Sequence, residues 1–159
     1  TNGRNNNDVK YFHSEPIMYT NGKTEHIIKY FPLELATFFP DLKIVSISSS
    51  KMAEIHSSDL QQFGENIVVI RIPFNEIEVL ETDLFQFNPN LEMIDLSYNK
   101  LKHIEDGAFR GLEKLTELFL ENQEQSSCTG GSAKNRSEVV ELIKTVKLQC
   151  KDLSLNQEA

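Results

Sequence analysis

Histidines and glutamates are the residues of this chain that could carry acid–base chemistry. The four histidines are scattered, at His13, His26, His56 and His103. Four glutamates lie in segments that we expect to be turns and outer loops: Glu54, Glu76, Glu78 and Glu81. We interpret these glutamates as a solvated acidic rim, because general acid–base catalysis needs groups that converge on one substrate. The sequence has no glycine-rich phosphate loop, nucleophile elbow or HExxH motif, so we predict no enzymatic activity and no cofactor.

Cys128 and Cys150 are the two cysteines of the chain. A metal pair or a redox site is the functional alternative. Neither a CxxC motif nor a nearby histidine accompanies them, and metal sites need more ligands. We therefore predict a Cys128–Cys150 disulfide, which would close a loop of about 23 residues and contribute roughly 3 to 4 kcal/mol. Such a bond implies an oxidising compartment.

A glycosylation sequon, Asn135-Arg136-Ser137, lies between the two cysteines. Asn135 is therefore a candidate for an N-linked glycan. The alternative is that Ser137 serves only as the N-cap of a helix, because its oxygen can accept a hydrogen bond from an unpaired amide. Gln123 to Ala133 is expected to be a loop before this helix. The helix would present one apolar face made of Val139, Leu142, Ile143 and Val146.

The elements that position these residues are predicted by a repeating apolar pattern, clearest from Leu91 to Gln123. Its members are Leu91, Ile94, Leu96, Asn99, Leu101, Ile104, Phe109 and Leu112. They fit LxxLxLxxNxLxxIxxxxFxxL, and the frame restarts at Leu115, Leu118 and Leu120. The segment resembles animal, mostly extracellular, leucine-rich repeat proteins of the roughly 24-residue type.

Earlier copies of the pattern are recognisable but less regular. The second holds Leu42, Val45, Ile47, Met52, Ile55, Leu60 and Phe63, and the third holds Ile67, Ile70, Ile72, Asn75, Ile77, Leu80 and Phe85. Ser50 replaces the usual asparagine, and Asn88 replaces a leucine. We expect Asn75 and Asn99 to turn the chain and hydrogen-bond to backbone groups of adjacent repeats. About five units, two of them incomplete, must stack to bury their apolar faces.

The resemblance implies an α/β solenoid, a short horseshoe with a parallel β-sheet on its concave face. We expect one domain over residues 1–159, with an N-terminal β cap and degenerate first repeat (1–41), regular repeats (42–123) and a C-terminal helical cap (124–159). In the N-terminal part, Val9–Phe12 and Ile17–Thr20 are expected to pair as strands. The segment around Ile17 to Tyr19 would supply the first repeat's strand, with Asn21 to Glu25 as an insertion.

The repeat register predicts which side chains lie on the concave face. Solvent-facing strand positions are usually polar, yet Ile44, Val69 and Met93 form an apolar stripe there. Arg71 and Asp95 fall side by side beside it, and aromatic residues follow. An exposed apolar patch with aromatics and a central arginine indicates a protein interface. We predict the binding residues to be Ile44, Val69, Arg71, Phe74, Met93, Asp95, Tyr98 and Phe119. The alternatives are that β-branched residues merely suit strands, or that an N-terminal segment folds over the stripe.

Net charge and hydropathy restrict the partners. The formal net charge of −8 argues against nucleic acid and against an anionic membrane surface. No apolar run approaches the roughly 20 residues of a membrane helix, so we expect no membrane insertion. The chain opens with the polar stretch TNGRNNND, which is consistent with a mature chain after signal removal, with a cytosolic protein or with a shortened chain.

We therefore predict a secreted, extracellular, non-catalytic leucine-rich repeat module that binds another protein, or a second copy of itself as a homodimer, through its concave face. Similarity to short secreted arthropod leucine-rich proteins implies a role in immunity or extracellular signalling. One alternative is a pattern-recognition module that takes a lipid or another microbial product on the apolar stripe. Another is a structural part of a longer receptor.

Overall fold

The computed structural model describes residues 9–15, 17–18, 24–25, 27–124, 128 and 130–150. The strands are β1 (Tyr11–Ser14), β2 (Ile17–Met18), β3 (Thr24–Glu25), β4 (Ile44–Ile47), β5 (Val69–Arg71), β6 (Val79–Leu80), β7 (Met93–Asp95), β8 (His103–Ile104), β9 (Glu117–Phe119) and β10 (Ser132–Ala133). The helices are α1 (Leu35–Phe38), α2 (Ser57–Gln61) and α3 (Arg136–Gln149), with a 3₁₀ turn η2 at Gly64–Asn66.

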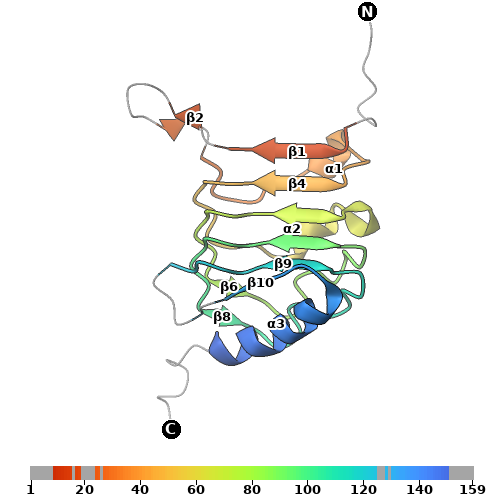
Figure 1. Ribbon diagram of the computed structural model, residues 1–159. Coiled ribbons are helices and arrows are strands. Elements are labelled where there is room, and N and C mark those ends of the chain that lie inside the picture. Colours follow the sequence, from red (N-terminus) through yellow and green to blue (C-terminus); the bar gives the residue numbers. More distant parts are fainter. Residues whose placement is uncertain are drawn as a thin grey trace, which may run out of the picture.

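A six-stranded sheet in the order β1-β4-β5-β7-β9-β10 runs through the whole molecule (Figure 1). Its first five strands are parallel, and β10 closes it antiparallel to β9. Across this sheet Ile44 pairs with Val69, Val69 with Met93, and Met93 with Glu117. Residue numbers therefore advance by 25, 24 and 24. This is the predicted α/β solenoid with a parallel sheet and a C-terminal helix, and the prediction is confirmed.

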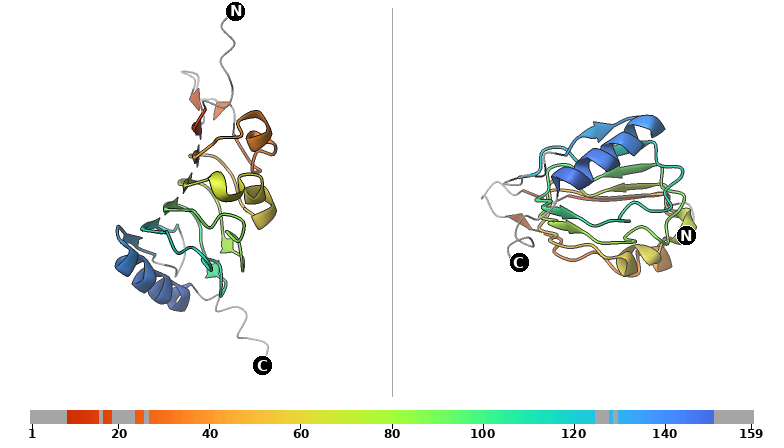
Figure 2. Two further views of the ribbon diagram at one scale, coloured as in Figure 1. Left: turned by 90° about the vertical axis from the view of Figure 1, so that its right-hand side faces the viewer. Right: turned by 90° about the horizontal axis from the view of Figure 1, so that it is seen from below.

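Alternation along each strand places one side chain of the sheet in the core and the next on the opposite face. The core-facing residues Val45, Ile70, Ile94 and Leu118 are all fully buried. The other wall of the core consists of α1, α2 and the two-stranded β6–β8 sheet, which lie behind the main sheet in the side view of Figure 2. Aromatic residues fill this wall, and the rings of Phe85 and Phe109 stack 6.0 Å apart between repeats.

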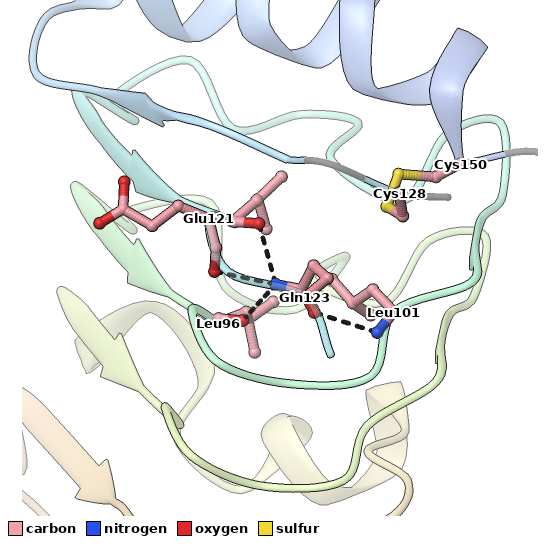
Figure 3. The surroundings of a disulfide bond; sticks show 7 residues. Leu96, Leu101, Glu121, Gln123, Cys128 and Cys150 are labelled. Carbon is pink, nitrogen blue, oxygen red and sulfur yellow. Dashed lines mark hydrogen bonds between the residues drawn. A yellow bond between two sulfur atoms is a disulfide. The ribbon is translucent and has the colours of Figure 1, made fainter. Parts of the chain in front are cut away.

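Asn75, Asn99 and Gln123 form a ladder of side-chain hydrogen bonds at the turn after the strands. The Asn99 Oδ1 accepts the Ile77 amide at 3.1 Å, and the Asn99 Nδ2 donates to the carbonyls of Ile72, Leu96 and Ser97. Asn75 bonds in the same way to the preceding repeat. Gln123 accepts the Leu101 amide at 3.0 Å and donates to three carbonyls (Figure 3). The predicted asparagine ladder is confirmed, and it continues through a glutamine that the sequence pattern did not identify.

Asn88, which replaces a leucine, is fully buried and connects two repeats. Its Nδ2 donates to the carbonyls of Leu60 and Gly64, each at 3.0 Å. These carbonyls lie where α2 ends and η2 begins. Because the residue added to this repeat is accommodated around Gly64–Asn66, an amide donor here satisfies carbonyls that a leucine would leave unpaired.

The N-terminal strands differ from the predicted arrangement. β1 does not pair with β2 as expected; it pairs in parallel with β4, with Tyr11 beside Ile44 and Ser14 beside Ile47. The first repeat's strand is therefore Tyr11–Ser14, and the assignment of Ile17 to Tyr19 was wrong. β2 instead pairs antiparallel with β3. This hairpin lies in a spacing of 33 residues between Tyr11 and Ile44, so the longer repeat is accommodated by local pairing at a turn.

The C-terminal end is covered by α3, whose Val139 and Val146 are buried while Leu142 and Ile143 are partly buried against the core. In the view from below in Figure 2, α3 lies across the end of the stack. The predicted N-cap, Ser137, is wrong: the N-cap is Asn135, whose Oδ1 accepts the Glu138 amide at 3.0 Å. The loop expected up to Ala133 contains β10, because the sheet needs a closing strand. Among the described residues, no helix is long and apolar enough to cross a bilayer.

Cys128 and Cys150 form the predicted disulfide. Both cysteines are fully buried, and the Cys150 carbonyl accepts the Ile104 amide from β8. Figure 3 shows the bond beside the Gln123 turn. The disulfide therefore fastens the end of α3 to the segment that leaves the last repeat.

Candidate functional site

The candidate site is the open face of the main sheet, defined as the side of β1, β4, β5, β7 and β9 that faces away from the core. All eight binding residues predicted from the sequence lie on this face or on the turn at its end. The apolar stripe runs from Ile44 through Val69 to Met93 in direct strand register, and the structure places each of the three side chains half-buried. Glu117 continues the row on β9, so the stripe ends in a carboxylate.

Arg71 and Asp95 occupy the next row and form an ion pair across β5 and β7. The Arg71 Nε lies 3.6 Å from the Asp95 Oδ2. Asp95 is 8 % exposed, and its Oδ1 accepts from the Ser97 amide at 3.1 Å and from the Ser97 Oγ at 2.6 Å. The carboxylate is therefore fixed by its own strand. The guanidinium, with half of its side chain exposed, keeps donors available to a partner on the open face.

Phe74 and Tyr98 form an exposed aromatic pair at the end of the strands. Their ring centroids are 4.3 Å apart and the rings are within 12° of parallel. Phe74 is 51 % exposed and Tyr98 45 % exposed. Both residues have positive φ angles, 55° and 54°, as do Ser49 and Asn122 at the same position of their repeats. This left-handed corner costs energy for a residue with a Cβ, and it directs both rings outward beside Arg71.

The row of Arg71 continues to Phe119 on β9, whose side chain is half-buried. The described part of the N-terminal segment does not fold over the stripe, because β1 extends the sheet edge beside β4. That segment adds two members to the face that sequence reasoning missed. Tyr11 lies in the row of Ile44 and is 50 % exposed, and its ring stacks on that of His13 at 5.8 Å. The alternation in VKYFHS predicts Tyr11 and His13 on one face of a strand. They were not assigned to the open face because this strand was expected to pair in a hairpin.

The four glutamates of the predicted acidic rim lie away from the open face, around a surface pocket that also contains His56. They are paired with cations: Glu76 lies 3.3 Å from Lys100, and Glu78 lies 2.7 Å from Lys102. Glu54 and Glu81 flank the His56 ring, at 3.7 Å and 3.2 Å. These pairs support the solvated-rim interpretation, since Glu76, Glu78 and Glu81 contact basic side chains of neighbouring repeats.

A hydrogen bond from the His56 ring to the Glu81 carboxylate raises the pKa of His56, and the charges of Glu81, Asp59 and Glu54 act in the same direction against partial burial. Hydrogen bonds from Thr82 lower the pKa of Glu105. Among the described residues, no cluster of three His, Cys, Asp or Glu side chains could hold a metal ion. His13 and His103 lie apart from His56, and His26 lies outside the described residues. The arrangement offers ion pairs between repeats.

A continuous parallel sheet, a ladder of amide side chains and a regular step of 24 residues define a solenoid of short repeats. Residues 65–124 match the family model described as Leucine rich repeat. This match covers 60 of the 159 residues, and the fold as a whole is that of a short leucine-rich repeat solenoid.

Two solved structures with similar folds both contain Toll-type receptors. One is a chain of the Toll–Spatzle complex from Drosophila, with 22 % identity and a TM-score of 0.62, covering 74 % of this chain. The other is a chain of the TLR13–ssRNA13 complex, with 29 % identity and a TM-score of 0.50, covering 52 % of this chain. This chain spans only 14 % and 11 % of their lengths. A comparison with curated protein sequences finds no match.

Proposed function

We propose that this chain is a non-catalytic binding module that recognises another protein through the open face of its sheet. The observation that carries the proposal is the row Ile44–Val69–Met93, half-buried and apolar where solvent-facing strand positions are usually polar. Arg71 and the exposed Phe74–Tyr98 pair lie beside it. Aromatic residues and arginine are the types that dominate binding energy at protein interfaces, and an apolar centre with a polar rim is their usual arrangement.

The extracellular setting is part of the same proposal. The buried Cys128–Cys150 disulfide supports an oxidising compartment, and hence a secreted protein or an ectodomain. The Drosophila neighbour is described as a complex of Toll with Spatzle that acts in development and innate immunity. Its similarity supports a role in immunity or extracellular signalling, of the kind expected for short secreted arthropod leucine-rich proteins.

Met93→Asp tests the open face directly. The immobilised protein and this variant are exposed to the same native extracellular fluid, and captured proteins are compared by quantitative mass spectrometry. We expect a partner that the wild type retains and Met93→Asp loses by at least tenfold, because the carboxylate is placed in the middle of the apolar stripe. Val79→Asp is the matched control, since Val79 is an exposed strand residue on β6, away from the open face. Equal capture by both variants would refute the proposal.

A lipid or microbial ligand on the apolar stripe is the second candidate, favoured by the continuity of its three apolar side chains. A lipid site is usually an enclosed pocket. Four surface pockets lined by described residues, around His56, His103, Ile143 and Tyr30, lie away from the open face. Thermal-shift measurements with candidate lipids separate the two, because only the lipid candidate predicts stabilisation that Met93→Asp abolishes.

From the net charge of −8 we predict that this chain does not bind nucleic acid. One similar chain was solved in complex with single-stranded RNA. On the open face Arg71 is accompanied by Asp95, Glu117 and Glu121. A phosphate backbone would therefore meet more carboxylates than cations there. Filter binding with single-stranded RNA at low salt should show no retention, and salt-sensitive retention would contradict this.

Asn135 is the proposed glycosylation site. Its side chain is exposed and uses Oδ1 for the helix cap, so attachment at Nδ2 leaves the cap intact. After secretion from animal cells, the wild type should lose one N-glycan mass on treatment with a peptide N-glycosidase. Asn135→Asp preserves the cap, Ser137→Ala preserves the asparagine, and both should abolish the shift. An unshifted wild type would show that the sequon is unused.

A further inference from the structure

The outer edge of β1 carries backbone groups that point away from the sheet. The Lys10 carbonyl accepts the Ile44 amide and the Ser14 carbonyl accepts the Ser48 amide, so alternate residues of β1 bond to β4. In a parallel ladder the residues between them direct their amide and carbonyl groups to the other side. Those residues are Tyr11 and His13. Among the described residues no strand pairs with that edge, and β1 is the end strand of the main sheet, with the β2–β3 hairpin beyond its C-terminal end in Figure 1.

β1 is short, at four residues, but contains no proline, bulge or inward-pointing charge. Natural edge strands are protected by proline, inward-pointing charge, bulges or a covering element. β1 contains Tyr11, Phe12, His13 and Ser14 in an unbroken register with β4. Phe12 faces the core side but is only half-buried, whereas its register neighbours Val45 and Ile70 are fully buried. Among the described residues, the core is therefore less completely covered at this end.

We propose that a second copy of this chain pairs its β1 antiparallel with this edge, about a twofold axis through Phe12. Regular antiparallel pairing requires that outward-directed residues face each other. Tyr11 and His13 are symmetric about Phe12, so this axis opposes Tyr11 of each copy to His13 of the other. Each of these two pairs exchanges two main-chain hydrogen bonds. The two Phe12 side chains meet on the axis and complete the core of both copies.

Charge also favours an antiparallel second copy. β1 begins beside Lys10 and ends beside Glu15, so antiparallel pairing brings the cationic end of one strand next to the anionic end of the other. The neighbourhood is balanced within each chain, since Lys10 lies 3.1 Å from Asp41 and His13 lies 3.2 Å from Glu15. The glutamates of the acidic rim lie at other repeats. The excess negative charge of the chain therefore does not oppose the contact locally.

Such a dimer would present both open faces on the same side of one continuous sheet. The rows of Tyr11 and His13 would form its centre, and the two apolar stripes would lie on either side. This inference does not rest on the proposed function, because the edge and the open face are different surfaces. If the open face does bind a protein, a dimer gives that partner two equivalent sites.

Sedimentation velocity over a concentration series tests the dimer. The wild type should shift from monomer to dimer with a midpoint in the micromolar range. His13→Pro removes the outward amide of residue 13 and leaves the β1–β4 hydrogen bonds in place, so it should raise the dissociation constant at least tenfold. Met93→Asp should leave it unchanged. A wild type that stays monomeric, or a dimer lost in Met93→Asp and kept in His13→Pro, overturns the proposal.

Cysteine cross-linking tests the axis itself. Facing residues of a non-hydrogen-bonded antiparallel pair have Cα atoms about 4.5 Å apart, within reach of a disulfide. Phe12→Cys should therefore form a covalent dimer under mild oxidation. Ser14→Cys is the matched control, because the two Ser14 Cα atoms would be about 14 Å apart along the paired strands. Equal cross-linking of both variants, or of neither, contradicts an axis through Phe12.

Discussion

The two ends of the solenoid differ in how completely they cover the apolar core of the last repeat. At the C-terminal end β10 pairs with β9, α3 covers the stack and the Cys128–Cys150 disulfide fastens the helix. At the N-terminal end β1 is the end strand of the main sheet. Leu118 and Phe12 occupy equivalent register positions, yet Leu118 is fully buried and Phe12 only half-buried. A repeat therefore derives its burial from both neighbours, and the end repeat over which the described residues place no cap is the weaker one.

Substitution of these two equivalent residues gives the largest expected difference. Leu118→Ala should lower the free energy of unfolding by about 2 to 5 kcal/mol, because it leaves a cavity between β7 and the cap. Phe12→Ala should cost about 1 kcal/mol, since water already reaches its ring. Urea unfolding followed by far-UV circular dichroism measures both. Equal losses would show that the N-terminal end is packed as well as the C-terminal end.

Removal of the disulfide should lower the stability of the C-terminal end toward that of the N-terminal end. The double variant Cys128→Ser, Cys150→Ser should lose about 3 kcal/mol, because the closed loop between residues 128 and 150 no longer restricts the unfolded chain. Hydrogen exchange should show faster exchange in α3 and little change in β4 and β5. Unchanged protection of α3 would mean that its apolar face alone holds the cap.

The ladder positions at the two ends offer a smaller contrast. Gln123→Ala should cost about 1 to 2 kcal/mol, because it removes an acceptor of the Leu101 amide and a donor to the Leu96 and Leu120 carbonyls. Ser50→Ala should cost about 0.5 kcal/mol, since its hydroxyl donates only to the Ser48 carbonyl at 3.3 Å. Urea midpoints compare the two variants. A larger loss for Ser50→Ala would contradict the assigned roles.

The smallest expected effect is on pH dependence, with opposite signs in the two halves. Folding raises the pKa of His56 above 6.5, so its stabilisation is complete below that pH and is lost as pH rises through the folded pKa. Folding lowers the pKa of Glu105 below 4.5, so its stabilisation is present above that pH and is lost on acidification. Both groups are substantially exposed, so the effects are small.

Unfolding of wild type, His56→Gln and Glu105→Gln from pH 4 to 8 checks this. His56→Gln should remove part of the loss of stability above pH 6.5, and Glu105→Gln part of the loss near pH 4. Identical pH profiles for all three proteins would show that neither the His56–Glu81 contact nor the hydrogen bonds of Glu105 affect stability.

The sequence predicted the elements whose residues repeat and missed those that depend on the ends. Ile70, Ile94 and Leu118 follow one period, so their burial and the rows of the open face could be predicted together. The partner of β1 could not, because VKYF suits a hairpin and a parallel sheet equally well. The N-cap of α3 was predicted wrongly because Asn135 and Ser137 are both good N-cap residues. The position at which the chain leaves β10 decides between them. Gln123 was missed because a longer side chain reproduces the bonds of asparagine.

In the proposed dimer, the edge of β1 limits how many copies can assemble, because each chain offers only this one edge for pairing. A growing fibre needs two active ends on every unit, one to join and one to be joined. Here β10 and α3 terminate one end of every chain. When two β1 edges meet, both reactive ends are consumed and growth stops at two units. In the proposed dimer, the β1 edge therefore both joins two copies and limits the assembly to two.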